Sequence, residues 1–255
     1  MSLPDLAVDL AYALDAVAFA EDRLGFRPDD WQEQLLRSVS KRIILNCCRQ
    51  SGKSTTTAIL ALHTALYDPG GLILLISPSL RQSKELFNKV IVFLRALEPA
   101  EVLEEDNKAS CQLANGSRIV SLPSDEKTVR GYSGPRLIVE DEASRVDDEV
   151  NGAIRPMLAV GGGRLVLMST PAGKRGHFFD AWHGVGDGWQ RIRLLASECP
   201  RIRSEFLEEE ERTLGPLMFA QEYQCRFEDT AQSAFATALI EAAFTNAFRP
   251  FLAAA

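Results

Sequence analysis

The chain of 255 residues lacks the features that mark several large classes of protein. No apolar stretch approaches the ~20 uncharged residues that cross a bilayer, because Asp5, Asp9 and Asp15 interrupt the apolar N-terminal run. No basic segment precedes an apolar one, as it would in a signal peptide, and repeats and low-complexity tracts are missing. With 46% hydrophobic and 25% charged residues, the composition excludes a disordered or fibrous chain and predicts a globular protein without a membrane segment.

Cysteine and histidine are scarce and carry no metal-ligand spacing. The five cysteines are an odd number without a CxxC pair, and Cys47 and Cys48 are neighbours inside an apolar run. We expect buried, reduced thiols, as in cytosolic proteins. The three histidines, His63, His177 and His183, are predicted to be structural.

An excess of positive charge is also missing. The chain has 28 Lys and Arg against 35 Asp and Glu, a net charge of -7. This balance argues against a generic nucleic-acid binder.

The hydrophobic pattern predicts alternating strands and helices. Apolar residues at helical spacing over residues 4–24 indicate one amphipathic helix, and Asp29 or Asp30 is placed to cap a second one that ends near Ser40. The strand runs are continuously apolar, which is typical of strands covered on both faces in a parallel sheet. Asn115-Gly116 predicts a hairpin with a type I′ turn between Cys111 and Leu122. Strands are expected at 42–47, 72–76, 137–139, 165–168 and 189–195, and further helices at 52–67, 80–97, 202–214 and 216–223.

Residues 47–55, Cys-Cys-Arg-Gln-Ser-Gly-Lys-Ser-Thr, lie between a predicted strand and a predicted helix. That is the setting of a phosphate loop, in which backbone N–H groups surround a phosphate, Lys53 neutralises its oxygens and Ser54 ligates Mg²⁺. The first glycine of the usual pattern is replaced by Cys47, and Arg49 adds a second cation. The alternative is an ordinary helix start with a surface lysine, and the flanking strand and helix favour the phosphate loop.

A second block ends the strand predicted at 137–139. Its acidic end, Glu-Asp-Glu, would lie beside the phosphate loop, because the carboxyl ends of parallel strands face one crevice. There Asp141 is suited to the Mg²⁺ shell and Glu142 to deprotonating water. A solvated acidic loop is the alternative, but the chain order of the two blocks favours a nucleotide site.

Three smaller features fit the same site. Ser169 and Thr170 end another strand and can contact a γ-phosphate or water, although a simple turn before proline is the other interpretation. Gln32 can pair with an adenine edge through its amide. Arg130 is either an arginine finger or a surface arginine.

The blocks together resemble the ATPase domain of the large terminase subunit of tailed bacteriophages, the motor that packages DNA into procapsids. The resemblance covers roughly residues 26–235 and includes the replaced first glycine. Its blocks are Pro28 to Gln32, Arg49 to Ser54, Arg130-Gly131, Val139 to Glu142 and Ser169-Thr170-Pro171.

The resemblance implies a P-loop NTPase of the ASCE type: an α/β fold with a mostly parallel sheet flanked by helices and a small C-terminal helical lid. It implies ATP and Mg²⁺ as cofactors, with Asp141 and Ser54 on the metal and Glu142 as base. Arg49 would act in cis, and Arg130 would reach the neighbouring subunit's ATP, although which of the two arginines is the finger stays open. The implied nucleotide contacts are Trp31, Gln32, Arg49, Gln50, Ser51, Gly52, Lys53, Ser54, Thr55, Ser169 and Thr170.

The resemblance also implies double-stranded DNA, a homo-oligomeric ring on a portal protein and a small terminase subunit as partners, in the host cytoplasm. We expect an ATPase core at 1–196, a lid at 197–235, and at 236–255 either the start of a nuclease domain or a tail of cloning origin, hence no nuclease activity. A helicase-type translocase lobe or a nucleotide-gated interaction module are the alternatives. Candidate DNA contacts are Arg81, Lys84, Lys89, Arg191 and Arg193, most of which are more simply solvated.

Overall fold

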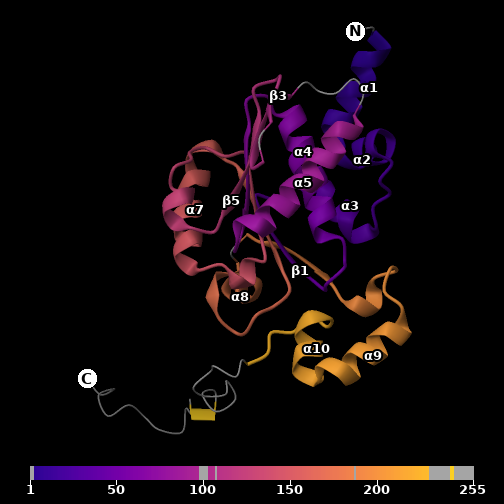
Figure 1. Cartoon of the computed structure of the whole chain (residues 1–255), viewed down its shortest axis with the longest axis vertical. Coiled ribbons are helices and arrows are strands. Elements are labelled where there is room, and N and C mark those ends of the chain that lie inside the picture. The colour runs from indigo at the N-terminus through magenta and orange to yellow at the C-terminus, as the bar shows by residue number, and fades with distance from the viewer. Residues whose placement is uncertain (1–2, 98–102, 107, 187, 230–241, 244–255) are drawn as a thin grey trace, which may run out of the picture.

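The computed structural model is built on one eight-stranded sheet in the order β3-β4-β5-β2-β6-β7-β1-β8 (Figure 1). The strands from β5 to β8 in this order are parallel, and β3 and β4 are antiparallel at one edge. The strands are β1 (Arg42–Cys47), β2 (Leu72–Ser77), β3 (Leu103–Asp106), β4 (Ser110–Leu113), β5 (Arg118–Pro123), β6 (Leu137–Asp141), β7 (Arg164–Ser169) and β8 (Gln190–Leu194). The structure describes residues 3–97, 103–106, 108–186, 188–229 and 242–243.

Helices cover both faces of the sheet. In Figure 1, α2 to α5 lie on one side, α7 and α8 on the other, and α9 and α10 beyond one end of the sheet. The helices are α1 (Leu3–Leu14), α2 (Ala16–Leu24), α3 (Asp30–Leu36), α4 (Lys53–Tyr67), α5 (Leu80–Ala96), α6 (Glu126–Val129), α7 (Asp148–Gly161), α8 (Gly176–His183), α9 (Ser204–Leu214) and α10 (Pro216–Glu222), with short 3-10 turns η1 (Ala143–Arg145) and η2 (Ala196–Glu198). None of the helices in the described ranges is long and apolar enough to cross a membrane.

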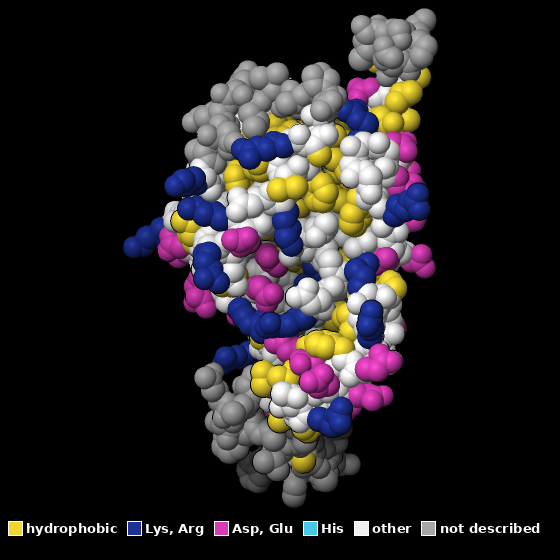
Figure 2. Space-filling model, turned by 45° about the vertical axis from the view of Figure 1, so that its right-hand side comes forward, with side chains coloured by type: hydrophobic (Ala, Val, Ile, Leu, Met, Phe, Trp, Pro, Cys, Tyr) yellow, Lys and Arg dark blue, Asp and Glu magenta, His cyan; other side chains and the backbone are white. Residues whose placement is uncertain are grey.

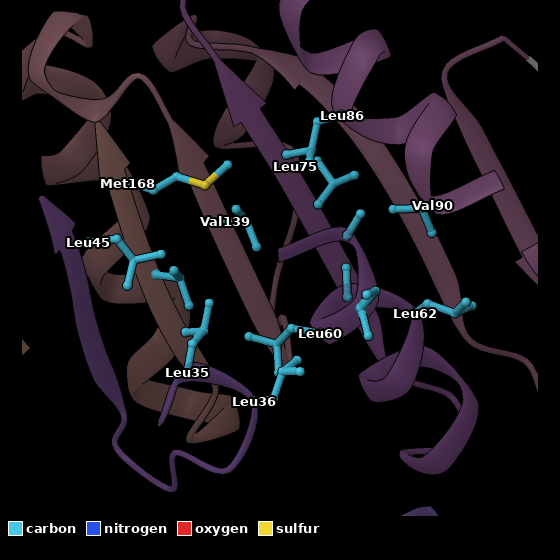
Figure 3. Packing of buried hydrophobic residues seen from close by; sticks show 14 of the residues in the cluster. Leu35, Leu36, Leu45, Leu60, Leu62, Leu75, Leu86, Val90, Val139 and Met168 are labelled. Carbon is cyan, nitrogen blue, oxygen red and sulfur yellow. The ribbon is translucent and has the colours of Figure 1, made fainter. Parts of the chain in front are cut away.

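The larger core lies between the sheet and α4 and α5. Leu75, Val139, Met168 and Leu45 come from four adjacent strands and lie in a row under these helices (Figure 3). All four are fully buried, and Leu60 of α4 packs in the same cluster. The opposite face of the same strands is also buried, which explains why their sequences are continuously apolar.

The N-terminal segment differs from the single helix predicted over residues 4–24. The helix stops at Leu14, and α2 starts after Asp15, whose backbone is extended and whose carboxylate accepts the N–H of Val17 at 2.9 Å. Arg37 also pairs with this carboxylate at 3.1 Å. A capping side chain inside an apolar repeat therefore divides one predicted helix into two.

The hairpin forms where it was predicted, but the prediction of a type I′ turn was wrong. Of Asn115 and Gly116 only the glycine has a positive φ, at 82°. The Gly116 N–H donates to the carbonyl of Leu113 at 2.9 Å, so a β-turn is followed by a left-handed glycine. The Asn115 amide instead donates to the carbonyls of Ala65 and Leu66 at the end of α4, and this tertiary contact fixes its conformation.

Candidate nucleotide-binding site

The loop between β1 and α4 has the backbone of a phosphate-binding loop. Gln50 and Gly52 have positive φ angles of 59° and 92°, which turn successive N–H groups toward the start of α4. Lys53 is buried, and its Nζ donates to the carbonyls of Cys47 and Cys48 at 2.9 and 3.0 Å. The ammonium is thereby held inside the curve of the loop, where it faces any anion bound there.

Gly52 is required by close packing as well as by its φ angle. A Cβ at this position would lie 2.9 Å from Nε2 of Gln32. Gln32 is 1% exposed, and its Oε1 accepts the N–H of Asp29 at 2.8 Å, which starts α3. The predicted adenine-binding helix and the phosphate loop are therefore in direct contact.

The acidic end of β6 lies next to this loop. Asp141 Oδ1 accepts the N–H of Glu142 at 3.0 Å, and Glu142 adopts a left-handed backbone with φ of 52°, uncommon for a residue with a side chain. Burial raises the pKa of Asp141 to about 6, as does the charge of Glu142, while Lys53 opposes the shift. The Asp141 carboxylate is therefore bonded to the turn that carries Glu142.

These elements enclose one cavity of about 610 Å³. It contains most of the residues predicted to bind nucleotide or metal, drawn from α3, the phosphate loop and the end of β6. Its lining is Phe26, Gln32, Arg49, Gln50, Ser51, Gly52, Lys53, Ser54, Thr55, Gln82, Lys89, Asp141, Glu142, Arg145 and Arg201. A cavity of about 500 Å³ on the other face, between α7 and α8, holds none of the predicted site residues.

Four predicted residues do not reach this lining, as far as the described residues define it. Trp31 is buried in the apolar core, because its position on α3 turns the ring inward. Ser169 and Thr170 are buried at the end of β7. Arg130 is 64% exposed and pairs with Glu126 on α6.

Ser144, which the sequence analysis did not single out, joins the two strand ends. Its hydroxyl donates to the carbonyl of Thr170 at 2.8 Å and lies 2.7 Å from the hydroxyl of Ser169. Ser144 follows Glu142 by two residues, in the turn η1. The end of β7 is thus bonded to the segment that carries Glu142.

Two arginines and a glutamate complete the site, and sequence reasoning missed all three. Arg201 donates to the carbonyl of Ser51 and pairs with Asp29, both at 2.6 Å. Arg145 pairs with Glu142, and Glu222 of α10 pairs with Arg49. Arg201 and Glu222 reach the loop from distant segments, whereas Arg145 follows Glu142 by three residues.

All five cysteines are free and buried, as expected, and three of them surround the phosphate loop. Burial raises the pKa of Cys47 to about 12 and that of Cys48 to about 11. Burial also raises the pKa of Cys225, whose Sγ donates to the carbonyl of Leu194 at 3.2 Å.

The histidines are in structural positions. His63 packs against Phe19 with ring centroids 5.5 Å apart. His177 Nε2 lies 2.6 Å from the buried carboxylate of Glu140, and His183 stacks on Phe179.

Three of the predicted DNA contacts, Arg191, Lys89 and Arg193, lie in different surroundings. Arg191 turns inward and donates to the carbonyls of Trp182 and Ala181, so its guanidinium is a structural group. Lys89 lines the nucleotide cavity, and Arg193 is exposed. On the face shown in Figure 2, basic and acidic side chains are interspersed.

The donor set at the phosphate loop fits Mg²⁺. The Ser54 hydroxyl and the Asp141 carboxylate both line the cavity, and they supply the hard oxygen ligands that this ion prefers. Mg²⁺ is commonly held by one or two such groups together with substrate phosphates.

The strand order defines the class of protein. β7 lies between β1, which leads into the phosphate loop, and β6, which ends in Asp141 with Glu142 following. A strand inserted there, with a glutamate after the acidic strand, is the arrangement of the ASCE P-loop NTPases, and the chain has this fold.

Within that class the chain belongs to the large terminase subunits. The family model described as "Terminase large subunit, T4likevirus-type, N-terminal" matches residues 44–242. The large terminase subunits of Thermus phage G20c and Thermus virus P23-45 are 25% and 26% identical over 83% of this chain. The chain spans 51% of the length of either relative.

Solved structures share the fold. The ATPase domain of the large terminase of Thermus phage P74-26 matches with a TM-score of 0.75 and 22% identity, over 84% of this chain and 99% of that domain. The large terminase of bacteriophage HK97 matches with a TM-score of 0.70 and 18% identity, over 84% of this chain and 55% of that one.

Proposed function

We propose that this chain is the Mg²⁺-dependent, ATP-hydrolysing motor domain of a phage large terminase. The observation that carries the proposal is the convergence of Lys53, Ser54, Asp141 and Glu142 on one cavity. These residues belong to separate segments and supply the cation, the metal ligands and the base that phosphoryl transfer needs.

The roles follow from position. Lys53 and the loop N–H groups would bind the β- and γ-phosphates, with Arg49 adding charge in cis. Ser54 and Asp141 would hold Mg²⁺, which neutralises phosphate charge when bound. Glu142 would accept a proton from the attacking water at its carboxylate, which Arg145 orients through a 2.7 Å contact.

Base recognition is assigned to Gln32. Its oxygen already accepts the Asp29 N–H, so Nε2 remains as the donor toward adenine. Phe26 also lines the cavity and would offer an apolar surface to the base. Trp31, on the buried side of α3, would anchor this helix to the core rather than touch nucleotide.

Arg130 is proposed as the finger that acts on a neighbouring subunit. Its side chain is exposed and outside its own cavity, so it can complete only another copy's site without a large rearrangement. Ser169 and Thr170 are proposed to relay the state of the site through Ser144. These assignments require an oligomer, which we take to be a ring.

Translocation of double-stranded DNA into a procapsid is the proposed output. The proposed partners are a portal protein and the small terminase subunit, and the proposed location is the host cytoplasm. A ring needs few DNA contacts per subunit, so the net charge of -7 is compatible with this output. We retain 1–196 as the core and 197–235 as the lid. The latter holds α9 and α10, and its last residues lie outside the described ranges; of 236–255 only residues 242–243 are described.

Steady-state ATPase measured against protein concentration tests the proposal. A finger in trans predicts specific activity that rises as subunits associate, whereas a nucleotide-gated module predicts negligible turnover at every concentration. A helicase-type lobe predicts stimulation by single-stranded DNA instead of double-stranded DNA. Plasmid incubated with the chain and Mg²⁺ or Mn²⁺ should stay intact, since no nuclease activity is proposed for these residues.

A further inference from the structure

His177, the second residue of α8, contacts two carboxylates at once. Its Nε2 lies 2.6 Å from Oε1 of Glu140 on β6, and its Nδ1 lies 3.1 Å from Oδ1 of Asp148 on α7. The same Asp148 oxygen accepts the backbone N–H of His177 at 2.7 Å. Since both ring nitrogens face carboxylate oxygens, both donate and the ring is an imidazolium. Burial lowers the pKa of His177, but hydrogen bonds and charge from Glu140 and Asp148 outweigh burial, so the pKa is raised.

Glu140 lies in apolar surroundings on the sheet. Ile138 packs in the core under α7 and α8, on the side of the sheet that these helices cover in Figure 1, and Glu140 points the same way two residues later. Its register partners on the neighbouring strands are Ile76 and Leu167, both fully buried. The Glu140 side chain is 0% exposed, and its Oε2 has no hydrogen-bond partner among the described residues. The imidazolium of His177 therefore compensates a buried charge.

This buried ion pair lies directly before the two carboxylates of the nucleotide cavity. Glu140 is followed in the chain by Asp141 and Glu142, which line that cavity. Two residues beyond Glu142, the Ser144 hydroxyl is bonded to the end of β7. His177 belongs to the segment that follows β7, because α8 is the next helix in the chain. The acidic segment is thus held before and after the two carboxylates by one stretch of chain, residues 169–177.

We propose that His177 is a positioning residue for ATP hydrolysis: its bond to Glu140 fixes the strand end that presents Asp141 and Glu142 to the nucleotide. The inference rests on the roles proposed for these two carboxylates. In the described part of the chain, His177 is outside the lining of the nucleotide cavity, so it acts through Glu140. Loss of this contact should slow hydrolysis and leave nucleotide affinity nearly unchanged, because Lys53 and the loop N–H groups bind the phosphates separately.

Two substitutions separate the contacts of His177. A glutamine amide nitrogen has the reach of imidazole Nε2, so His177→Gln keeps a donor toward Glu140. An asparagine amide nitrogen has the reach of Nδ1, so His177→Asn keeps a donor toward Asp148 alone. The single-turnover rate should fall about tenfold to a hundredfold in His177→Asn and His177→Phe, but only about threefold in His177→Gln. ATPγS affinity should stay within about twofold in all three variants.

Hydrogen exchange reports on the strand end without nucleotide or turnover. The Glu142 N–H donates to Asp141 Oδ1 at 3.0 Å. Its protection in the nucleotide-free chain, measured by NMR, should fall in His177→Asn and stay near the wild-type value in His177→Gln. His183→Gln on the same helix is the matched control, since His183 bonds the Phe179 carbonyl, and it should change neither rate nor protection.

A double variant covers the case in which His177→Asn fails to fold. Glu140→Gln combined with His177→Asn leaves no unpaired buried charge, so this chain should fold, and its single-turnover rate should still be low. Chemical rescue is a second measurement, because His177 also lines the cavity of about 500 Å³ between α7 and α8. Imidazole in solution should restore part of the rate of His177→Gly, whereas thiazole, a ring of the same size without an N–H, should not.

The outcomes separate the inference from the proposed function. A wild-type rate in His177→Asn, or an equal loss in His177→Gln and His177→Asn, would overturn the inference while the nucleotide site stands. Equal rescue by imidazole and thiazole would do the same, since the ring would then only fill space. A slower rate with unchanged protection of the Glu142 N–H would also overturn it. A wild-type chain that binds no ATPγS would overturn both the inference and the proposed function.

Discussion

The Ser144 hydroxyl donates to the Thr170 carbonyl at 2.8 Å and must accept from the Ser169 hydroxyl, which lies 2.7 Å away. Ser144 has one proton, so the direction of both bonds follows. A single side chain therefore joins the turn after Glu142 to the end of the neighbouring strand.

Ser144→Ala should slow turnover without weakening nucleotide binding. Loss of both hydrogen bonds should raise the activation free energy of hydrolysis by about 1 to 1.5 kcal/mol, which lowers kcat roughly five- to tenfold. Single-turnover hydrolysis and ATPγS titration check the two halves of this expectation. Ser144→Thr retains the hydroxyl and should restore most of kcat; failure of this rescue would mean that the serine contributes only packing.

Lys53→Ala should abolish nucleotide binding or turnover. The variant removes the cation at the centre of the loop, and loss of such a group costs about 10²- to 10³-fold in rate. Lys84→Ala on α5, outside the cavity lining of the described residues, is the matched control and should bind normally. Unchanged ATPase in Lys53→Ala would remove the phosphate-loop assignment.

Glu142→Gln should retain ATP binding and stall hydrolysis. The amide keeps a hydrogen bond to Arg145 but cannot take the proton of water, so kcat should fall about 10²- to 10⁴-fold. Mg²⁺-ATP binding and product release are to be measured separately, with the exposed Glu149→Gln on α7 as control. Normal turnover in Glu142→Gln would transfer the role of base to another group.

Arg130→Ala should leave nucleotide binding by the monomer intact and eliminate the turnover gained on assembly. Arginine fingers contribute about 10³- to 10⁵-fold, and this one would act only across an interface. Mixing Arg130→Ala with Glu142→Gln subunits should restore part of the activity, because each supplies what the other lacks. The exposed Arg155→Ala is the control. If Arg130→Ala instead weakens binding in the monomer, the residue acts in cis.

Asp15 gives a prediction for stability and pH. Its pKa is lowered: burial opposes this, but hydrogen bonds from Arg37 and from the N–H of Val17 outweigh burial. A lowered folded pKa gives stability that is complete above the unfolded value of about 3.9 and is lost as pH falls through the folded value.

Asp15→Ala should lower the free energy of unfolding by about 1 kcal/mol at pH 7, and Asp15→Asn by less, because asparagine still caps α2. In both variants the free energy of unfolding should fall less steeply as the pH drops below about 4. Urea unfolding from pH 3 to 7 measures this, with the exposed Asp22→Asn as reference. If Asp15→Asn loses stability below pH 4 as steeply as the wild-type chain, other carboxylates cause that loss of stability.

The sequence predicted those parts of the fold that local patterns determine. Apolar runs located β1, β2, β6 and β7, the strand predicted at 189–195 is β8, and the predicted phosphate loop and acidic strand end line the same cavity. The sequence analysis missed helices α7 and α8. Pro156 and three consecutive glycines at the end of α7, and the glycines around α8, are residues that normally interrupt helices, so packing against the rest of the fold must stabilise both.

The candidate site shows the same division. Lys53, Asp141 and Glu142 belong to spaced motifs and lie on one cavity, as predicted. Glu222 and Arg201 lie more than a hundred residues from the loop they touch. No pattern in sequence predicts such a contact, because it exists only once the fold has placed Arg201 and Glu222 beside the loop that follows β1.

The buried thiols around the phosphate loop make the chain suitable for site-specific chemistry. Cys47, Cys48 and Cys225 are protonated at neutral pH and shielded from reagents, so they should react slowly with maleimides. A cysteine placed at an exposed position such as Arg130 would then be the fastest-reacting thiol. Fluorophores attached there would report distances between neighbouring subunits without removal of any native cysteine.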